Sequence, residues 1–235
     1  MSASFEARLA MVRERMARAC ARANRPLESV RLLPVTKTVE PYRIREAVEA
    51  GLTVFGENRV QEARRKIPLC PDRIEWHLIG HLQSNKVKLA VSLFSCIHSV
   101  DSQPLLTVLE EACARAGRRL PIFLEVNVAG EATKFGFAPA DVIEAVRAAN
   151  ACPHLEVVGL MTIPPFVPDP EAARPFFRRL RLLRDEVAQA AGTPLPELSM
   201  GMSHDFEIAI EEGATWIRVG TALFGPRSDP SEDGV

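Results

Sequence analysis

A regular alternation of short β-type runs with longer helix-type segments is the feature that most constrains how this chain can fold. Runs rich in β-branched and aromatic residues indicate strands, and apolar residues at the 3.6-residue period indicate helices. Strands are expected at residues 30–35, 53–58, 75–80, 96–101, 121–128, 157–163, 197–201 and 216–224. Helices are expected at residues 41–50, 59–67, 84–92, 102–116, 139–149, 170–191 and 204–212. An additional amphipathic helix is expected before the first strand, with apolar positions from Phe5 to Ala19.

Eight strands that alternate with helices imply one parallel sheet. For 235 residues without a linker or a composition break, the expected fold is a single closed (β/α)8 barrel of the TIM type with an extra N-terminal helix. We expect this domain to span residues 1–227, and the acidic, proline-containing residues 228–235 to be a disordered tail. An open doubly wound sheet is the alternative, but no G-x-G-x-x-G motif follows the first expected strand to favour it.

Composition and charge exclude several classes of function. A hydrophobic content of 47% and a charged content of 25% are typical of a globular domain. The formal net charge of -1 argues against a nucleic-acid-binding protein, which needs a basic face. No apolar stretch approaches the roughly 20 residues of a membrane-spanning helix. The five cysteines are scattered without a C-x-x-C pair, which fits a cytoplasmic protein in a reducing compartment.

Polar residues and glycines gather where the expected strands end. In a (β/α)8 barrel these carboxyl ends share one rim, and active groups collect there. The residues expected at this rim are Lys37, Asn58, His81, Asp101, Asn127, Thr162, Ser199, Arg218, Gly220 and Thr221. Their common location is a stronger indication of a functional site than any single motif.

Lys37 ends the first expected strand and is the leading candidate for covalent chemistry. Burial penalises a charged amine and so favours its neutral, nucleophilic form. Such an amine forms a Schiff base with an aldehyde, and pyridoxal phosphate is the commonest aldehyde held in this way. The plain alternative is a solvated lysine at a strand end. Lys134, on a loop, is the second candidate amine.

The loops after the seventh and eighth strands fit a phosphate group. Barrel enzymes often bind phosphate there through backbone N–H groups and a helix N-terminus. Residues 199–203 and 220–222 supply glycines for close backbone approach and hydroxyl groups as donors. The alternative is that Gly201 and Gly220 permit tight turns and that the hydroxyl groups cap helices.

Arg218 and Asn58 are the remaining candidate binding residues. Strand alternation places Arg218 on the same face as Gly220, so a guanidinium group in the barrel mouth would need a partner there. That partner is either a pyridine nitrogen or a carboxylate in a structural salt bridge. Asn58 either contacts a cofactor ring or caps the helix that follows it.

The histidines give no indication of a metal site. His81 is typical of a surface loop, and the sequence spacing of His77, His98 and His154 does not suggest a convergent cluster. We therefore expect no metal chemistry.

From about residue 7 to residue 225 the sequence resembles the pyridoxal phosphate homeostasis proteins, a family also described as proline synthase co-transcribed proteins, and six motifs carry the resemblance. The motifs are residues 35–38 (VTKT), 55–62 (FGENRVQE), 76–86 (WHLIGHLQSNK), 159–164 (GLMTIP), 198–205 (LSMGMSHD) and 218–225 (RVGTALFG). The resemblance implies a single barrel like the N-terminal domain of bacterial alanine racemase, with pyridoxal 5'-phosphate as its cofactor.

The resemblance also implies a role for individual residues. Lys37 corresponds to the Schiff-base lysine, Arg218 to the partner of the pyridine nitrogen, and Asn58 to a residue that lines the ring. Phosphate contacts are implied for Ser199, Met200, Gly220 and Thr221, with Met200 and Gly220 acting through their backbone.

The family resemblance implies a protein that binds, protects and delivers pyridoxal phosphate, with no catalytic turnover firmly assigned to it. Apo enzymes that depend on this cofactor are the implied recipients. An amino-acid racemase-like enzyme is the alternative, but racemisation needs a second base, and Tyr42 is poorly placed for the opposite face. A cofactor-free Schiff-base aldolase is the third possibility. Because the racemase dimerises through a second domain that this sequence lacks, we expect a monomer.

Overall fold

Eight short parallel strands form the centre of the molecule in a computed structural model that describes residues 4–226. The strands are β1 (Arg31–Pro34), β2 (Val54–Glu57), β3 (Glu75–Leu78), β4 (Cys96–Val100), β5 (Leu120–Glu125), β6 (Leu155–Met161), β7 (Glu197–Ser199) and β8 (Trp216–Val219). The expected disordered tail, residues 228–235, lies outside the described residues.

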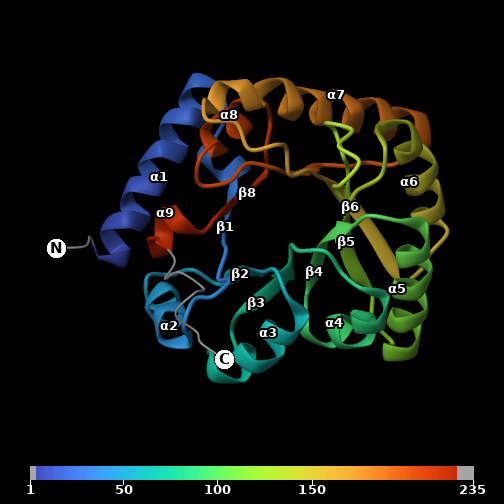
Figure 1. The fold of residues 1–235 in the computed structure, drawn as a ribbon, viewed down its shortest axis with the longest axis horizontal. Helices are drawn as coiled ribbons and strands as arrows, with labels where there is room; N and C mark the ends of the chain where they lie inside the picture. Colours follow the sequence, from blue (N-terminus) through green and yellow to red (C-terminus); the bar gives the residue numbers. More distant parts are fainter. Residues whose placement is uncertain (1–3, 227–235) are drawn as a thin grey trace.

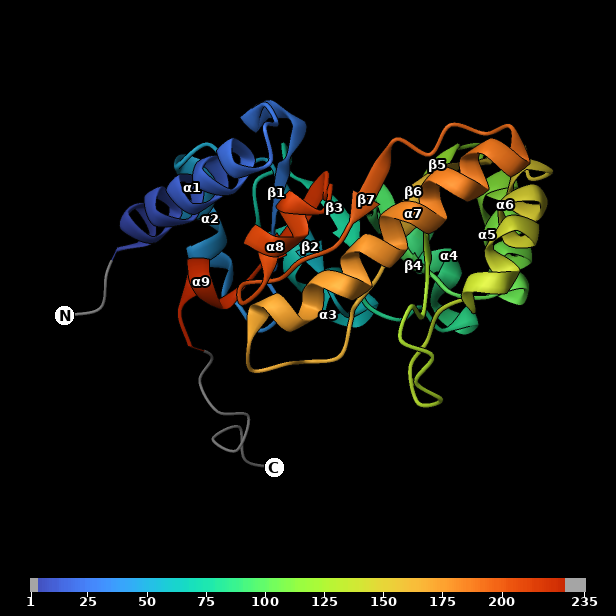
Figure 2. The same ribbon diagram turned by 90° about the horizontal axis from the view of Figure 1, so that it is seen from above.

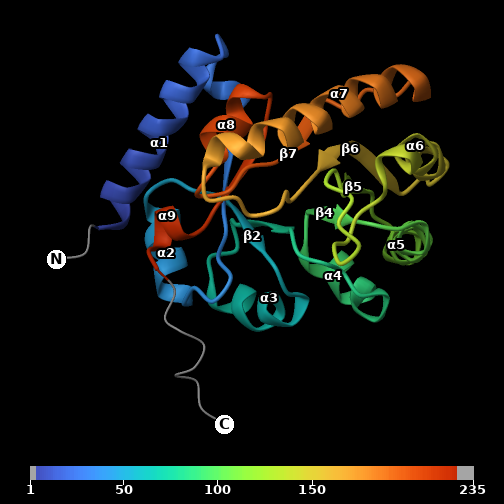
Figure 3. The same ribbon diagram turned by 45° about the horizontal axis from the view of Figure 1, so that its top comes forward.

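The strands pair in the order β1-β8-β7-β6-β5-β4-β3-β2, with every pair parallel. An isolated parallel bridge between Val35 and Gly56 joins the two outermost strands, and the Thr36 N–H donates to the Gly56 carbonyl at 3.0 Å. The sheet therefore curls into a nearly closed barrel (Figures 1 and 3). The predicted (β/α)8 architecture is confirmed, and the alternative of an open doubly wound sheet is wrong.

Helices surround the strands and cover the outside of the barrel (Figure 1). The α-helices are α1 (Phe5–Arg22), α2 (Pro41–Glu49), α3 (Val60–Lys66), α4 (Val87–Leu93), α5 (Gln103–Ala116), α6 (Val142–Asn150), α7 (Arg174–Ala191), α8 (Phe206–Glu211) and α9 (Thr221–Phe224). Short 3-10 helices are η1 (Leu27–Ser29), η2 (Ile67–Leu69), η3 (Ser84–Lys86), η4 (Pro139–Asp141) and η5 (Pro170–Ala173). Among the helices of residues 4–226, none combines the length and the apolar character that crossing a membrane requires.

The barrel buries side chains on both of its faces, as parallel strands between helices and a filled interior must. All residues of β4 are buried, for example. A separate interior cluster includes Leu33, Phe123, Met161 and Trp216, whose side chains meet inside the barrel. Because side chains alternate along a strand, Arg218, two residues after Trp216, also faces the interior, and so does Glu125, two residues after Phe123.

The last expected strand is shorter than its sequence pattern suggests. The prediction of a strand over residues 216–224 is wrong beyond Val219, because residues 221–224 form the helix α9. Leu223 and Phe224 are buried, and the ring of Phe224 lies 5.4 Å from that of Phe5 on α1. The apolar residues read as strand therefore pack against the N-terminal helix.

The expected extra helix is α1, which lies beside α8 and α9 on the outside of the barrel (Figures 1 and 2). The Ser4 hydroxyl accepts from the Ala7 N–H at its N-terminus, and its apolar stripe is buried. At its other end Arg25 donates to the carbonyls of Ile210 and Ala214 at 2.6 and 2.8 Å. These bonds join the segment after α1 to the C-terminal end of α8 and to Ala214, which follows it.

Candidate functional site

A cavity of ≈ 260 Å³ lies at the carboxyl ends of the strands. Its lining residues are Val35, Asn58, Ile79, Ile163, Met202, Ser203, His204, Arg218, Gly220 and Thr221. They come from six different strand ends, and Figure 2 shows the β5–α6 and β6–α7 connections projecting on one side of the barrel. A cavity is therefore present at the rim where the sequence predicts a site.

Arg218 is the charged group of this cavity. Its side chain is 3% exposed, and burial lowers the pKa of the guanidinium to about 10, against the opposite influence of Asp205 and Glu125. It therefore stays charged at neutral pH. Its Nη1 donates to Ser199 Oγ and its Nη2 to the Thr162 carbonyl, both at 2.8 Å. Among residues 4–226 no carboxylate forms an ion pair with it, so the structural salt bridge considered for Arg218 is not found.

Backbone amides at the start of α9 form a second polar side of the cavity. The N–H groups of Gly220 and Ala222 donate to Ser203 Oγ at 3.2 and 3.3 Å. One oxygen atom of the β7–α8 loop thus accepts from two amides of a single segment after β8, which is the arrangement that an anionic oxygen would take. Gly220 is half-buried, and Thr221 is exposed at the rim.

Ser199 and Met200 do not line the cavity. Both are fully buried, the Ser199 hydroxyl is bonded to Arg218, and the Met200 N–H donates to the Trp216 carbonyl at 3.1 Å. The cavity residues of this segment are instead Met202, Ser203 and His204. The reason is that β7 continues to Ser199 and the chain turns only at Gly201, which has a φ of 90°. The sequence pattern located the loop but not the residues that face inward.

Lys37 lies in a turn two residues beyond Val35, which lines the cavity. Its side chain is half-buried rather than buried, and Lys37 is not one of the lining residues. The expectation that deep burial activates this amine is therefore not met. Among the described residues the Lys37 side chain has no hydrogen-bond or ion-pair partner, so its amine is available.

The turn that carries Lys37 is fixed on both sides. Before it, the Thr36 carbonyl accepts from Lys66 Nζ at 2.7 Å, and the Thr36 hydroxyl donates to Glu57 at 2.6 Å. After it, the Thr38 N–H donates to Glu62 at 2.7 Å. Thr38 itself adopts a φ of 60°, a left-handed conformation that costs energy for a β-branched residue. The surrounding bonds therefore hold Lys37 in a defined place.

Lys66 is the centre of this arrangement, and no sequence pattern clearly indicated this role. Its Nζ lies 2.7 Å from carboxylate oxygens of both Glu57 and Glu62, and its side chain is 8% exposed. Burial raises the pKa of Glu57, although Lys66 opposes this effect. The one available signal was the i,i+4 spacing of Glu62 and Lys66, which is common on exposed helix faces as well.

Asn58 lines the cavity and does not cap the following helix, because the N-cap of α3 is Arg59 and no side chain caps it. The close approach of Gly80 sets the position of Asn58. A Cβ atom at Gly80 would lie 2.3 Å from the Asn58 carbonyl oxygen. A glycine at residue 80 therefore allows β2 and β3 to meet at the mouth.

His77 and His98 lie side by side, although the sequence spacing suggested no cluster of histidines. His77 Nδ1 lies 3.0 Å from His98 Nε2, and the ligand atoms of His77, Cys96 and His98 lie within 4.8 Å of one another. The expectation was wrong because neighbouring strands bring together residues that are 21 positions apart in the sequence. His81 is exposed on a loop, as expected, and its Nδ1 lies 2.7 Å from Asp101.

Lys134, the second candidate amine, lies at the rim. Its Nζ is 2.9 Å from Glu131 and 3.5 Å from the carbonyl of Ile163, a cavity residue. Its amine is therefore engaged by a carboxylate, unlike that of Lys37.

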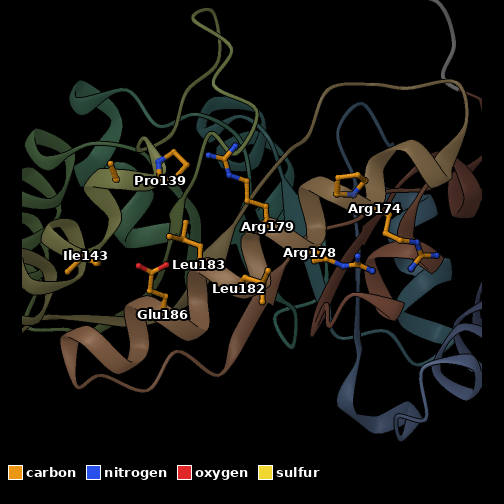
Figure 4. Close-up of a pocket in the computed structure, with 10 residues that line it drawn as sticks. Pro139, Ile143, Arg174, Arg178, Arg179, Leu182, Leu183 and Glu186 are labelled. Atoms are coloured by element: carbon orange, nitrogen blue, oxygen red, sulfur yellow. The ribbon is translucent and has the colours of Figure 1, made fainter.

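A larger cavity of ≈ 660 Å³ lies outside the barrel between α6 and α7 (Figure 4). Arg174 and Arg178 line one end of it, but both already pair with Glu212, at 3.1 and 3.0 Å. It contains none of the strand-end residues. We therefore assign the candidate site to the smaller cavity at the barrel mouth, which contains the buried Arg218 and lies next to the turn that carries Lys37.

The family model for the alanine racemase N-terminal domain matches residues 8–228. A pyridoxal phosphate homeostasis protein of Aquifex aeolicus (strain VF5) is 48% identical over 221 residues, covering 94% of this chain and 97% of the relative. This chain belongs to the pyridoxal phosphate homeostasis protein family. The family member of Homo sapiens is 40% identical over 235 residues, covering 93% of this chain and 85% of that protein.

A solved structure that is similar in sequence also has a similar fold. PipY of Synechococcus elongatus PCC7942, with PLP bound, superposes with a TM-score of 0.82 at 39% identity, covering 94% of this chain and all of that one (100%). The similarity to known proteins thus extends from the sequence to the fold.

Proposed function

We propose that this protein binds pyridoxal 5'-phosphate at the barrel mouth, holds it through a Schiff base to Lys37, and serves in its intracellular homeostasis and delivery without firm catalytic turnover. The observation that carries the proposal is one cavity that combines a buried, charged Arg218 with the paired amides of Gly220 and Ala222. The PLP-bound relative and the names of the family members support it.

The chain's own groups fit the three polar parts of this cofactor. When bound, the cofactor supplies an aldehyde that condenses with an amine and a ring that withdraws electrons. Arg218 offers N–H donors that stay charged at neutral pH, which suit an unprotonated pyridine nitrogen. The amides of Gly220 and Ala222, with the hydroxyl groups of Ser203 and Thr221, suit a phosphate.

Lys37 and Asn58 complete the proposed site. The Lys37 turn starts two residues after the cavity residue Val35, and the Lys37 amine has no competing partner in the described part of the chain. Asn58 lies on the adjoining strand end, where it can contact the ring. We place Ser199 and Met200 behind the cavity, so the phosphate contacts proposed for them pass to Ser203 and the α9 amides.

Arg218 also favours storage over turnover. A guanidinium donor keeps the ring nitrogen unprotonated, which weakens the ring as an electron sink. A racemase-like enzyme is the second candidate, with Glu125 at the end of β5 as its candidate base. Burial is the main cause that raises the pKa of this carboxyl to about 7, and the nearby Asp101 is the second cause. Turnover of an amino acid at a useful rate by the purified protein would establish the second candidate.

The first test is a visible absorption spectrum of the purified protein before and after borohydride, followed by mass mapping. We expect a yellow band that bleaches and an added mass on Lys37, and no band for Lys37→Ala. Protein that stays colourless and unmodified after incubation with pyridoxal phosphate would refute the proposal. Delivery is tested by adding an apo enzyme as recipient, and the proposed monomeric state by sedimentation.

A further inference from the structure

We propose that Ser199, His98 and His77 form a hydrogen-bond chain of fixed direction that holds Arg218 in place and stabilises its charge. Arg218 Nη1 lies 2.8 Å from Ser199 Oγ, which lies 2.8 Å from His98 Nδ1. His98 Nε2 in turn lies 3.0 Å from His77 Nδ1. The chain runs through the barrel interior, directly behind the residue that we propose to face the ring nitrogen, and to that extent the inference rests on the proposed function.

The direction of the chain follows from Arg218, because a guanidinium group can only donate. Ser199 Oγ accepts from Arg218, and its own proton needs an acceptor. Among the described residues the only one within reach is His98 Nδ1. His98 therefore carries its proton on Nε2 and donates it to His77 Nδ1, which leaves the proton of His77 on Nε2. In the reverse direction the serine proton would be buried without a partner.

The surroundings of the two imidazoles keep both of them neutral, as the chain requires. His98 is fully buried and His77 is 5% exposed. Burial lowers the pKa of His77 to about 4 and holds that of His98 well below its usual range. Aromatic walls fix the rings, since His98 stacks on Phe123 at 4.2 Å and His77 lies 5.1 Å from Trp216. Neither ring can leave the chain without disturbing the core.

The chain explains how a cation is buried here without a direct ion pair. Every acceptor lone pair along it points toward Arg218, so the dipoles of the serine and of both imidazoles present their negative ends to the guanidinium group. The Thr162 carbonyl does the same on Nη2. These neutral dipoles stabilise the charge without neutralising it. The remaining N–H groups of Arg218 stay available to a ligand in the cavity.

A metal ion held by His77, Cys96 and His98 is the competing use of the same side chains. It would have to displace a chain bond, since both ring nitrogens of His98 are already engaged. Burial raises the pKa of the Cys96 thiol, which disfavours the thiolate that a metal needs. Arg31 and Arg218 lie close enough to lower the pKa of His98, so a second cation would be repelled. These observations favour the chain.

Nitrogen NMR of histidine-labelled protein without cofactor tests the direction of the chain. We expect both His98 and His77 as neutral Nε2–H tautomers at pH 7, and a defined, slowly exchanging signal from the Arg218 side chain. A neutral Nδ1–H tautomer at either residue would overturn the proposal. Stoichiometric zinc in the purified protein, measured by mass spectrometry of the metal, would also overturn it in favour of the metal site.

The variant Ser199→Ala tests what the chain does for Arg218. We expect loss of the Arg218 signal and about 10- to 100-fold weaker pyridoxal phosphate binding, the range for one hydrogen bond to a charged group. Ser199→Thr keeps the hydroxyl and is expected to restore both. Ser95→Ala removes a serine hydroxyl that donates only to the Trp76 carbonyl and serves as the matched control.

The two proposals can fail separately. If Ser199→Ala binds the cofactor like the wild type and keeps the Arg218 signal, the chain does not position Arg218. If the histidine tautomers and the Arg218 signal behave as expected but the wild type binds no pyridoxal phosphate, the positioning chain stands and the proposed function fails.

Discussion

Replacing Lys66 by methionine removes the cation that holds the Lys37 turn. The substitution keeps an unbranched side chain of similar length but leaves Glu57, which is 0% exposed, without a positive partner. Glu57 Oε2 already lacks a hydrogen-bond partner within the described structure, so this carboxylate has little other stabilisation. The Thr36 carbonyl also loses its bond to Lys66 Nζ. The variant therefore tests whether the cluster of Lys66, Glu57 and Glu62 is a structural support of the site.

Removing one partner of a buried ion pair typically costs about 3–5 kcal/mol. Glu62 is only partly buried and can recover water, so we expect the lower part of this range, about 3 kcal/mol in the free energy of unfolding at pH 8. The loss should shrink as the pH falls toward 5. Burial raises the folded-state pKa of Glu57 and Lys66 lowers it, so without Lys66 this pKa rises further. The folded protein then takes up a proton more readily than the unfolded chain, which stabilises it at lower pH.

Urea unfolding of the wild type and of Lys66→Met at pH 8 and pH 5 measures both effects. The double variant Glu57→Gln, Lys66→Met removes the orphaned charge and should recover most of the lost stability. Lys88→Met, on the exposed face of α4, is the control and should change the free energy of unfolding by less than about 0.5 kcal/mol. A loss below about 1 kcal/mol at pH 8, a larger loss at pH 5, or a double variant no more stable than the single one would refute the reasoning.

Gly80→Ala should weaken pyridoxal phosphate binding, measured by titration, because the added Cβ atom would lie 2.3 Å from the Asn58 carbonyl oxygen. Unchanged affinity would show that the close approach of Gly80 to Asn58 is not needed for binding. Glu125→Gln should be more stable than the wild type at pH 8 but not at pH 5. The folded-state pKa of Glu125, about 7, is higher than the ordinary 4.5, so the wild type loses up to roughly 3 kcal/mol of unfolding free energy as the pH rises from 4.5 to 7. Parallel pH profiles of the two proteins would contradict this. Arg25→Met should lower the free energy of unfolding by about 2–3 kcal/mol through the loss of two bonds to backbone carbonyls. Arg18→Met, which breaks only an exposed pair with Glu14, is its control, and equal losses would argue against docking of α1 through Arg25.

The barrel was predictable because its elements repeat a local signal. Each strand is a short buried run and each helix carries an apolar stripe, and both periodicities are visible without knowledge of the partner elements. Helix ends were also marked locally, as at Gly117 and Gly192, which take the left-handed conformation after α5 and α7. The error at residues 221–224 arose because an apolar run of that length fits a strand or a helix, and only packing against α1 decides between them.

The candidate site was predictable only to the level of strand ends. Alternation along β8 was enough to direct Arg218 inward. In contrast, the contacts of Lys66 with Glu57 and of His77 with His98 depend on which strands are neighbours and on their register. The same limit applies to Ser199. The sequence suggested its hydroxyl as a phosphate donor, but the register of β7 directs this hydroxyl toward Arg218. Spacing in the sequence contains no information about these distances.

The electrostatic balance around Arg218 connects the fold to the proposed function. Glu125 and Asp205 are near enough to raise its pKa, yet neither bonds to it, and burial raises the pKa of both carboxyls. A carboxylate bonded directly to Arg218 would occupy the N–H groups that face the cavity. Neutral dipoles from Ser199 and the Thr162 carbonyl instead hold the guanidinium group from behind. The cavity therefore keeps an unneutralised positive charge, which a ligand with an aromatic nitrogen and a phosphate can complement.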